Sequence, residues 1–413
     1  MQSSPTNDNK KVRKRFRELQ DIIDASEVRG TARFCRSISN KPARIFVDGV
    51  FDLTHYGHMN AFRQARALGG YLVVGVNSDE SVAVAKGLKP VLNDLERQRA
   101  VAACRFVDEI IPASPYVMSQ AYIEELMETH GIDFFVHGDD PCIVDGQDVY
   151  EAAKRLGKFL TIPRTDGIST TDIIGRLLLV SKDHHESIFD SEELNGDGCS
   201  TSTAPLFASQ QSQFLVTSNL LRAFSAALPG QSNRGGRVVY VDGAWDMFNA
   251  GHAEFLKTAR RFGDYLVVGV HSDAAVNEHR GGQHPIMSMH ERVLSVLGCQ
   301  YVDDVLLNAP WFVDQELVST LGIAVVVSGT AHEGASRVAD PPDPHEVPKT
   351  MGIHEEIQSE MFLSIDEILA RLQARRADVS KRYEEKQRKE RDWYDQKHGL
   401  TREHGNLLTR PNN

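Results

Sequence analysis

One segment of this sequence occurs twice at a nearly constant spacing, and this repeat constrains the fold more than any other feature. The first copy covers residues 48–58 and is followed by an apolar run at 71–76. The second copy covers 242–252 and is followed by an apolar run at 265–270, so 242 − 48 and 252 − 58 both give an offset of 194. A chain of 413 residues has room for about two to three domains. The repeat therefore predicts two similar domains in tandem.

Short apolar runs alternate with helical patterns in each copy. In the first copy, the runs at residues 45–47, 71–76, 109–111 and 134–136 have the composition of buried strands. Strands that alternate with helices pair in parallel through right-handed crossovers. The expected fold is α/β, with two tandem doubly wound parallel-sheet domains of Rossmann-like type. Ligands are expected beyond the carboxyl ends of the strands.

Shifts in composition divide the chain into five predicted parts. These are a polar N-terminal arm (1–43), a first α/β domain (44–183), a linker (184–236), a second α/β domain (237–372) and a charged helical tail (373–413). The linker is rich in Ser, Thr, Gln and Asn, but its residues 214–224 are apolar enough to form a helix that docks on a domain.

Charge and cysteine content exclude several classes of protein. A net charge of −11 argues against a general nucleic-acid binder, because such proteins present a basic face to phosphates. The five cysteines lie far apart without a CxxC pair, which fits a reducing compartment. No apolar stretch approaches the ~20 residues that a transmembrane helix needs. We therefore expect a cytoplasmic protein without a transmembrane segment.

Two clusters of polar residues suit a phosphate ligand. His55 and His58 flank Gly57 where the first strand gives way to a helix, and free N–H groups at a helix start attract anions. Residues 163–171 read Pro-Arg-Thr-Asp-Gly-Ile-Ser-Thr-Thr, in which Arg164 is a forked cation and the hydroxyls precede an apolar helix. Taken singly, surface histidines and an ordinary helix cap would explain them. Lys86 is expected to add a cation in a flexible loop.

Together these residues resemble the cytidylyltransferase family of nucleotidyltransferases, whose marks are HxGH and RTxGISTT in this order. Residues 55–58 and 164–171 match both marks without a mismatch. Two such domains joined by a polar linker are similar to the members that act on phosphoethanolamine, whereas those that act on phosphocholine have one domain and an amphipathic membrane-binding helix. The resemblance leaves open a homodimer and peripheral association with the endoplasmic reticulum.

The resemblance implies that the phosphate of phosphoethanolamine attacks the α-phosphorus of CTP in line, giving CDP-ethanolamine for phosphatidylethanolamine synthesis, while pyrophosphate leaves. Mg²⁺ is expected to arrive with CTP, without a dedicated protein metal site. The implied catalytic residues are His55, His58, Lys86 and Arg164. The implied nucleotide-binding residues are Val50, Phe51, Gly138, Asp139, Thr165, Ile168, Ser169 and Thr170. Lys86, Tyr116 and Asp140 would bind phosphoethanolamine, while Asp48 and Arg97 would support the site.

The second copy lacks several of these groups. Asn249 stands in place of the first histidine, and an amide carries no positive charge. Matching Gly352 with Gly167, at an offset of 352 − 167 = 185, places Glu355 and Glu356 where the hydroxyls of the first copy stand. Two carboxylates would repel a triphosphate there. We predict that the second domain is an inactive structural or regulatory partner.

Three other functions compete with this interpretation. The acceptor could be phosphocholine or another small phosphate ester, because the motifs specify CTP more firmly than the acceptor. The chain could be a CTP-sensing pseudoenzyme or scaffold, which fits the second copy and disagrees with the intact first copy. A class I aminoacyl-tRNA synthetase has a similar histidine turn, but this acidic chain shows no tRNA-binding domain.

Overall fold

The computed structural model describes residues 42–140, 142–144, 146–179, 213–228, 236–280, 284–330, 342–375, 378, 388, 401–403 and 406–408. Contacts divide the chain into two compact units. The first ends at Leu178 and resumes at Asp366, and the second holds residues 103–105 and 179–365. The expected N-terminal arm lies almost wholly outside the described residues, as do most of the linker and most of the charged tail.

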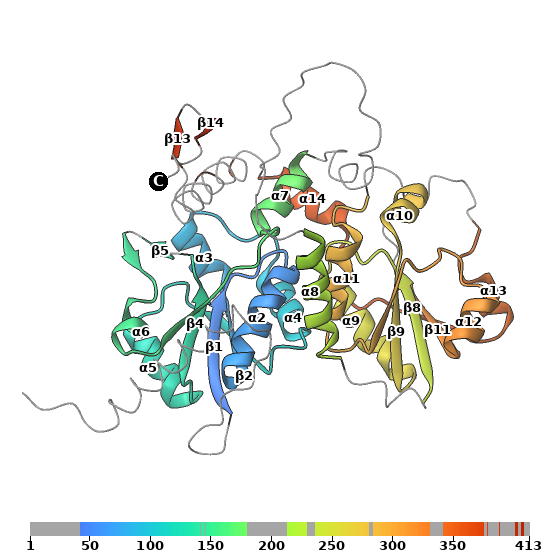
Figure 1. Cartoon of the computed structure of the whole chain (residues 1–413), viewed down its shortest axis with the longest axis horizontal. Coiled ribbons are helices and arrows are strands. Elements are labelled where there is room, and N and C mark those ends of the chain that lie inside the picture. The colour runs from blue at the N-terminus through green and yellow to red at the C-terminus, as the bar shows by residue number, and fades with distance from the viewer. Residues whose placement is uncertain are drawn as a thin grey trace, which may run out of the picture. The chain divides into compact units, whose positions relative to one another are not determined.

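A five-stranded parallel sheet forms the centre of the first unit (Figure 1). Its strand order is β3-β2-β1-β4-β7. The strands are β1 (Ala43–Gly49), β2 (Gly70–Asn77), β3 (Glu109–Ser114), β4 (Phe134–Gly138) and β7 (Phe159–Ile162). The chain order reverses direction between β1 and β4, so their carboxyl ends form the switch point at which sheets of this type bind ligands.

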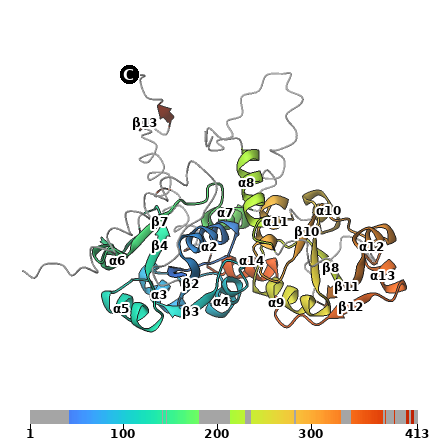
Figure 2. The same ribbon diagram turned by 60° about the horizontal axis from the view of Figure 1, so that its bottom comes forward.

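Helices cover both faces of this sheet. They are α2 (Tyr56–Gly69), α3 (Asp79–Lys86), α4 (Asp94–Ala102), α5 (Gln120–Thr129), α6 (Glu151–Arg155) and α7 (Thr170–Leu179), and a small hairpin of β5 (Ile143–Val144) and β6 (Gln147–Asp148) precedes α6. Helices α5 and α6 lie on one side of the strands, and α2 and α4 lie on the other (Figure 2). Phe46, Val73 and Phe135 point from the strands into the buried cluster under α5 and α6. These contacts hold the strands in place, and both motifs follow the carboxyl ends of strands of this sheet.

The second unit repeats this sheet, with the order β10-β9-β8-β11-β12. Its strands are β8 (Val238–Gly243), β9 (Tyr265–Val270), β10 (Asp304–Leu307), β11 (Ile323–Gly329) and β12 (His354–Ile357). Its helices include α9 (Ala250–Ala259), α10 (Asp273–Arg280), α11 (Met289–Leu297), α12 (Gln315–Leu321) and α13 (Glu346–Thr350). Asp48 pairs with Gly75 in the first sheet as Asp242 pairs with Gly269 in the second. The prediction of tandem doubly wound parallel sheets is confirmed.

The apolar part of the linker forms a helix, as the sequence predicts. Helix α8 (Gln213–Ser225) packs against α11, and its Phe224 is fully buried. Near the end of the tail, β13 (Thr401–Glu403) and β14 (Asn406–Leu408) form a short hairpin. In the described part of the chain, no helix combines the length and hydrophobicity that crossing a bilayer requires.

The structure corrects the alignment of the far motif in the second copy. Strand β12 begins at His354 as β7 begins at Phe159, an offset of 354 − 159 = 195. Helix α14 (Ile365–Gln373) then corresponds to α7 at 365 − 170 = 195. The counterpart of residues 163–171 is therefore 358–366, and the predicted match to 348–356 is wrong. Glu355 and Glu356 are exposed residues of β12, ten and nine residues before the start of α14 at Ile365.

Candidate active site

The two motif histidines form the start of α2 at the carboxyl end of β1. His55 is the N-cap, and its Nδ1 accepts from the Gly57 N–H at 3.1 Å. His58 completes the capping box, because its Nδ1 accepts from the His55 N–H at 3.4 Å. The two rings stack with their centroids 3.9 Å apart. Both imidazoles are held in place by backbone N–H groups at the start of α2, and His55 is also buried.

The second motif lies against this turn. The Thr165 hydroxyl accepts from Asn60 Nδ2 at 2.9 Å, on the second turn of α2. The Thr170 hydroxyl donates to the Asp52 carbonyl at 3.3 Å. At the start of α7, Ser169 Oγ accepts from the Asp172 N–H at 3.1 Å, which is the cap that the sequence predicts. The hydroxyl-rich helix start is thus joined to the loop that carries the histidines.

Strand β4 contributes the third side of the site. Its last residue, Gly138, leaves room for the next turn, because a Cβ atom there would lie 2.6 Å from Asp140 Oδ1. Asp139 Oδ1 accepts from the Arg164 N–H at 3.3 Å, which ties the β4 turn to the second motif. Ile168 is buried, and a Cβ atom on Gly57 would lie 2.8 Å from its Cγ2. A side chain at either glycine would force the neighbouring side chain, Asp140 or Ile168, to move.

Lys86 is not in a flexible loop, as the sequence analysis expected, but ends a helix. The Ser78 hydroxyl accepts from the Ser81 N–H and starts α3, and Gly87, with φ of 72°, ends it. The Lys86 ammonium lies 4.6 Å from the centre of the Tyr116 ring. Because Lys86 lies at the end of a helix, its backbone is fixed, and its ammonium group extends from a defined position beside the site.

A buried arginine holds the loops of the site together. The Arg97 side chain has no exposed surface, and it pairs with Asp79 at 2.7 Å and Asp94 at 2.5 Å. It also donates to the carbonyls of Val50 at 2.6 Å and Asn77 at 2.8 Å. A charge buried this deeply is tolerated only when its donors are matched. Arg97 therefore joins the turn after β1 to the end of β2 and the start of α4.

That turn has a strained backbone. Phe51 and Leu53 have φ values of 51° and 47°, a region that bulky residues rarely adopt. Phe51 is buried and meets the His58 ring edge to face at a centroid distance of 5.5 Å. Trp245 and Met247 adopt the same conformation in the second copy, with φ values of 56° and 49°. The strain belongs to the fold shared by both copies.

Asp48 lies deeper in the switch point, with Tyr150 above it. The Tyr150 hydroxyl donates to Asp48 Oδ1 at 2.8 Å, and its ring lies 4.8 Å from that of His137. Burial raises the pKa of the Asp48 carboxyl, while His137 and Tyr150 act in the opposite direction. Asp48 is thus fixed by hydrogen bonds rather than exposed to solvent.

Tyr116, one of the residues predicted to bind phosphoethanolamine, lies beside a thiol. The Tyr116 hydroxyl lies 3.8 Å from Cys142 Sγ. Burial raises the pKa of Cys142, the Tyr116 hydrogen bond lowers it, and the carboxylates of Asp48 and Asp140 raise it further. Of these groups, Tyr116 is in direct contact with Cys142. No role was predicted for Cys142 or Tyr150 from the sequence.

The same positions of the second copy carry different side chains. Asn249 caps α9 as His55 caps α2, and its Oδ1 accepts from the Gly251 N–H at 2.8 Å. Its amide donates to the Leu363 carbonyl at 3.0 Å. His345 replaces Tyr150, and its Nε2 lies 3.0 Å from Asp242 Oδ1. Burial, followed by the Arg280 charge, lowers the pKa of His252 to about 4, so this imidazole is neutral at pH 7.

The corrected alignment sharpens this contrast. Ser359 stands at the position of Arg164 and Ile365 at that of Thr170, both at an offset of 195. The second copy therefore lacks the forked cation and three of the four hydroxyls of the phosphate motif, because Glu360, Ile365 and Asp366 stand at the positions of Thr165, Thr170 and Thr171. The prediction that this copy lacks phosphate complementarity remains, but for a different reason than the two glutamates.

Comparison with known proteins agrees with this geometry. The cytidylyltransferase-like family model matches residues 46–176 and 240–357, one match for each sheet, and the chain belongs to this family. It is 41% identical to an ethanolamine-phosphate cytidylyltransferase of Arabidopsis thaliana over 86% of this chain and 86% of that protein. It is also 41% identical to the Dictyostelium discoideum protein of the same name, over 87% of this chain and 98% of that one. A probable choline-phosphate cytidylyltransferase of Schizosaccharomyces pombe is 40% identical over 33% of this chain and 38% of its own length.

Proposed function

We propose that this chain transfers CMP from CTP to phosphoethanolamine, giving CDP-ethanolamine and pyrophosphate. The observation that carries the proposal is the extent of the similarity: proteins named for phosphoethanolamine match 86% of the chain, whereas the protein named for phosphocholine matches 33%. The match thus includes the second domain and not the catalytic motifs alone.

The chemistry needs positioned charge rather than a protein nucleophile. The α2 start presents His55 and His58 beside the α7 start, so that a triphosphate lying across both would meet imidazoles at one end and hydroxyls with Arg164 at the other. The histidines would stabilise charge on the phosphorus undergoing attack. Lys86 would reach phosphates from the end of α3, and Tyr116 with the acidic groups near Cys142 would hold the ammonium end of the acceptor.

We further propose that Mg²⁺ enters with the nucleotide. Among the residues that the structure describes, no group of three His, Cys, Asp or Glu side chains is placed to hold a metal ion. Oxygen atoms of the triphosphate and water are ligands that Mg²⁺ accepts. The ion would supply neutralisation of phosphate charge, and the residues above would supply position.

Product analysis tests the proposal. The full chain would be incubated with CTP, Mg²⁺ and, separately, phosphoethanolamine, phosphocholine and a longer phospho-amino-alcohol. We expect CDP-ethanolamine as the main product. Faster turnover of phosphocholine would shift the assignment to the choline branch, and binding of CTP without any product would favour the sensor alternative.

A further inference from the structure

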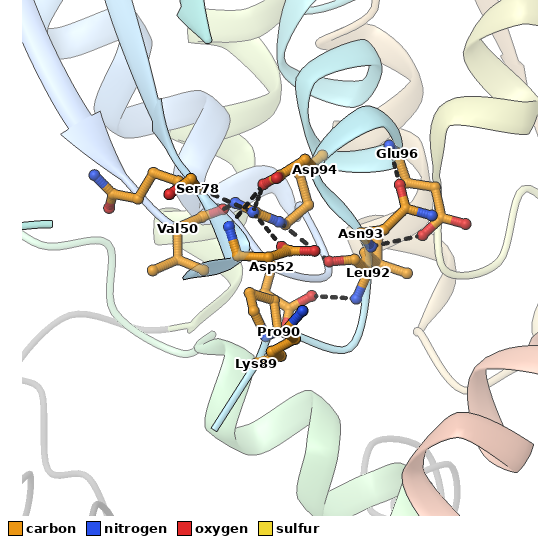
Figure 3. A network of polar contacts seen from close by, with 12 residues as sticks. Val50, Asp52, Ser78, Lys89, Pro90, Leu92, Asn93, Asp94 and Glu96 are labelled. Carbon is orange, nitrogen blue, oxygen red and sulfur yellow. Dashed lines mark hydrogen bonds and ion pairs between the residues drawn. The ribbon is translucent and has the colours of Figure 1, made fainter. Parts of the chain in front are cut away.

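The loop between α3 and α4, residues 87–93, is held on its inner side by the catalytic turn. The Asp52 carboxylate accepts from the N–H groups of Val91 at 2.7 Å and Leu92 at 2.9 Å. Figure 3 labels Asp52 and Leu92 among the residues of this network of polar contacts. Asp52 lies three residues before His55, and its own carbonyl accepts from Thr170. The position of this α3–α4 loop is therefore linked to both catalytic motifs.

The outer side of the same loop is held by α14, the helix that follows the degenerate motif of the second copy. Arg375 donates to the carbonyls of Lys89 at 3.2 Å and Pro90 at 3.1 Å. Arg371 donates to the Val91 carbonyl at 3.4 Å. These contacts explain why residues from Asp366 on belong to the first compact unit, whereas the sequence boundary at 372 leaves α14 with the second domain.

Helix α14 also forms an ion pair with Glu96 through Arg371, which pairs with Glu367 of its own helix as well. Two nitrogens of Arg371 meet the two oxygens of Glu96 at 2.7 Å and 2.9 Å. The Glu96 side chain is 9% exposed, and it also accepts from the Asn93 N–H at 2.8 Å at the end of the loop. A forked pair of this kind is geometrically specific, and a shielded carboxylate is unfavourable without its cation. Loss of Arg371 would therefore disturb the Glu96 contact that ends the loop.

We propose that Arg371 is a positioning residue for the cytidylyltransfer reaction, acting through Glu96 and the α3–α4 loop on Asp52 and the neighbouring histidines. This inference rests on the proposed function. In this proposal the second copy contributes without binding a nucleotide, because α14, its counterpart of α7, stabilises the α3–α4 loop of the first site.

The contact between the Asp52 carboxylate and the N–H groups of the loop has a counterpart in the second copy. In the second copy, Asp246 accepts from the N–H groups of Ile286 at 2.6 Å and Met287 at 2.8 Å. Arg292 Nε donates to the Met287 carbonyl at 3.0 Å, as Arg97 Nε donates to Leu92 at 3.1 Å. Because this aspartate contact lies within each copy and does not involve α14, a change at Arg371 should leave the first sheet folded and alter the loop.

The experiment uses the full chain with Arg371→Gln, Arg371→Lys and the matched control Gln373→Ala, an exposed position on the same helix. We expect Arg371→Gln to lower kcat about tenfold while the KM for CTP changes less than about threefold, because displaced catalytic groups act mainly in the transition state. Lysine should give an intermediate kcat, since it keeps the charge without the fork. Hydrogen exchange should accelerate in peptides covering 87–98 and stay unchanged in β1 and β4.

Coupling is tested with Glu96→Gln, which should add little to the loss caused by Arg371→Gln if both act through one contact. Wild-type kcat in Arg371→Gln would overturn the inference. So would a loss of kcat accompanied by faster exchange throughout β1 and β4, because that would show general destabilisation. If the wild-type chain made no CDP-ethanolamine, the proposed function would fail, while the exchange of residues 87–98 would still decide whether Arg371 braces the loop.

Discussion

Replacing His55 by Asn should separate the helix cap from catalysis. The second copy shows that Asn in this position makes the same cap, since Asn249 accepts from the N–H two residues on, at 2.8 Å against 3.1 Å for His55. Asn is among the best N-cap residues, whereas Ala costs about 1 kcal/mol there. We therefore expect His55→Asn to keep the melting temperature within about 2 °C and His55→Ala to lower it by several degrees.

Activity should respond differently. Removal of one preorganised transition-state donor usually lowers kcat by about 10²- to 10³-fold, which is about 2.7–4 kcal/mol. Both His55 variants should show a loss of this size, although only one is destabilised. The assay follows CDP-ethanolamine formation from CTP and labelled phosphoethanolamine, with thermal unfolding measured on the same samples. If His55→Asn kept more than about a tenth of wild-type kcat, the loss would be smaller than that expected for one preorganised transition-state donor, and our assignment would be refuted.

Three further predictions follow from the site and its degenerate copy. Arg164→Ala should raise the KM for CTP and lower kcat, because contacts to phosphoryl oxygens tighten in the transition state; unchanged CTP affinity by titration calorimetry together with unchanged turnover would contradict this. The folded-state pKa of His252 is lowered from 6.5 to about 4, so its contribution to the free energy of unfolding is present above pH 6.5 and falls by about 2 kcal/mol when the pH drops to 5. The free energy of unfolding should therefore fall more between pH 7 and pH 5 in the wild type than in His252→Gln, and an equal fall in both would contradict this prediction. A fragment of residues 1–183 lacks α14, so it should be poorly soluble or much less active at saturating CTP; full-length turnover would show that the second domain is dispensable.

The sheets and the meeting of the two motifs were predictable because both depend on local patterns. Apolar runs fix the strands, and strand order fixes which loops share an edge. Helix α3 was missed although its signals were present, since Ser78 caps its start and Gly87 ends it. The expectation of a flexible loop gave too little weight to these cap residues.

The far motif was misaligned because two turn glycines were treated as equivalent. Gly352, with φ of 68°, was matched with Gly167, but its counterpart is Gly157, with φ of 66°, in the turn before the last strand. A constant offset near 195 would have avoided the error. The Arg371 contact could not be read from any pattern, because its partner Glu96 lies 275 residues away and only tertiary packing brings them together.

The shared cap also bears on how a duplicated enzyme domain can fall silent. Histidine and asparagine both accept a hydrogen bond from a free N–H group at the start of the same helix, so a change between them should alter the stability of the fold very little. A copy relieved of turnover can therefore lose its imidazole without passing through an unstable intermediate. The Asn249 amide also donates to the Leu363 carbonyl, so a change to histidine in the second copy would remove this contact.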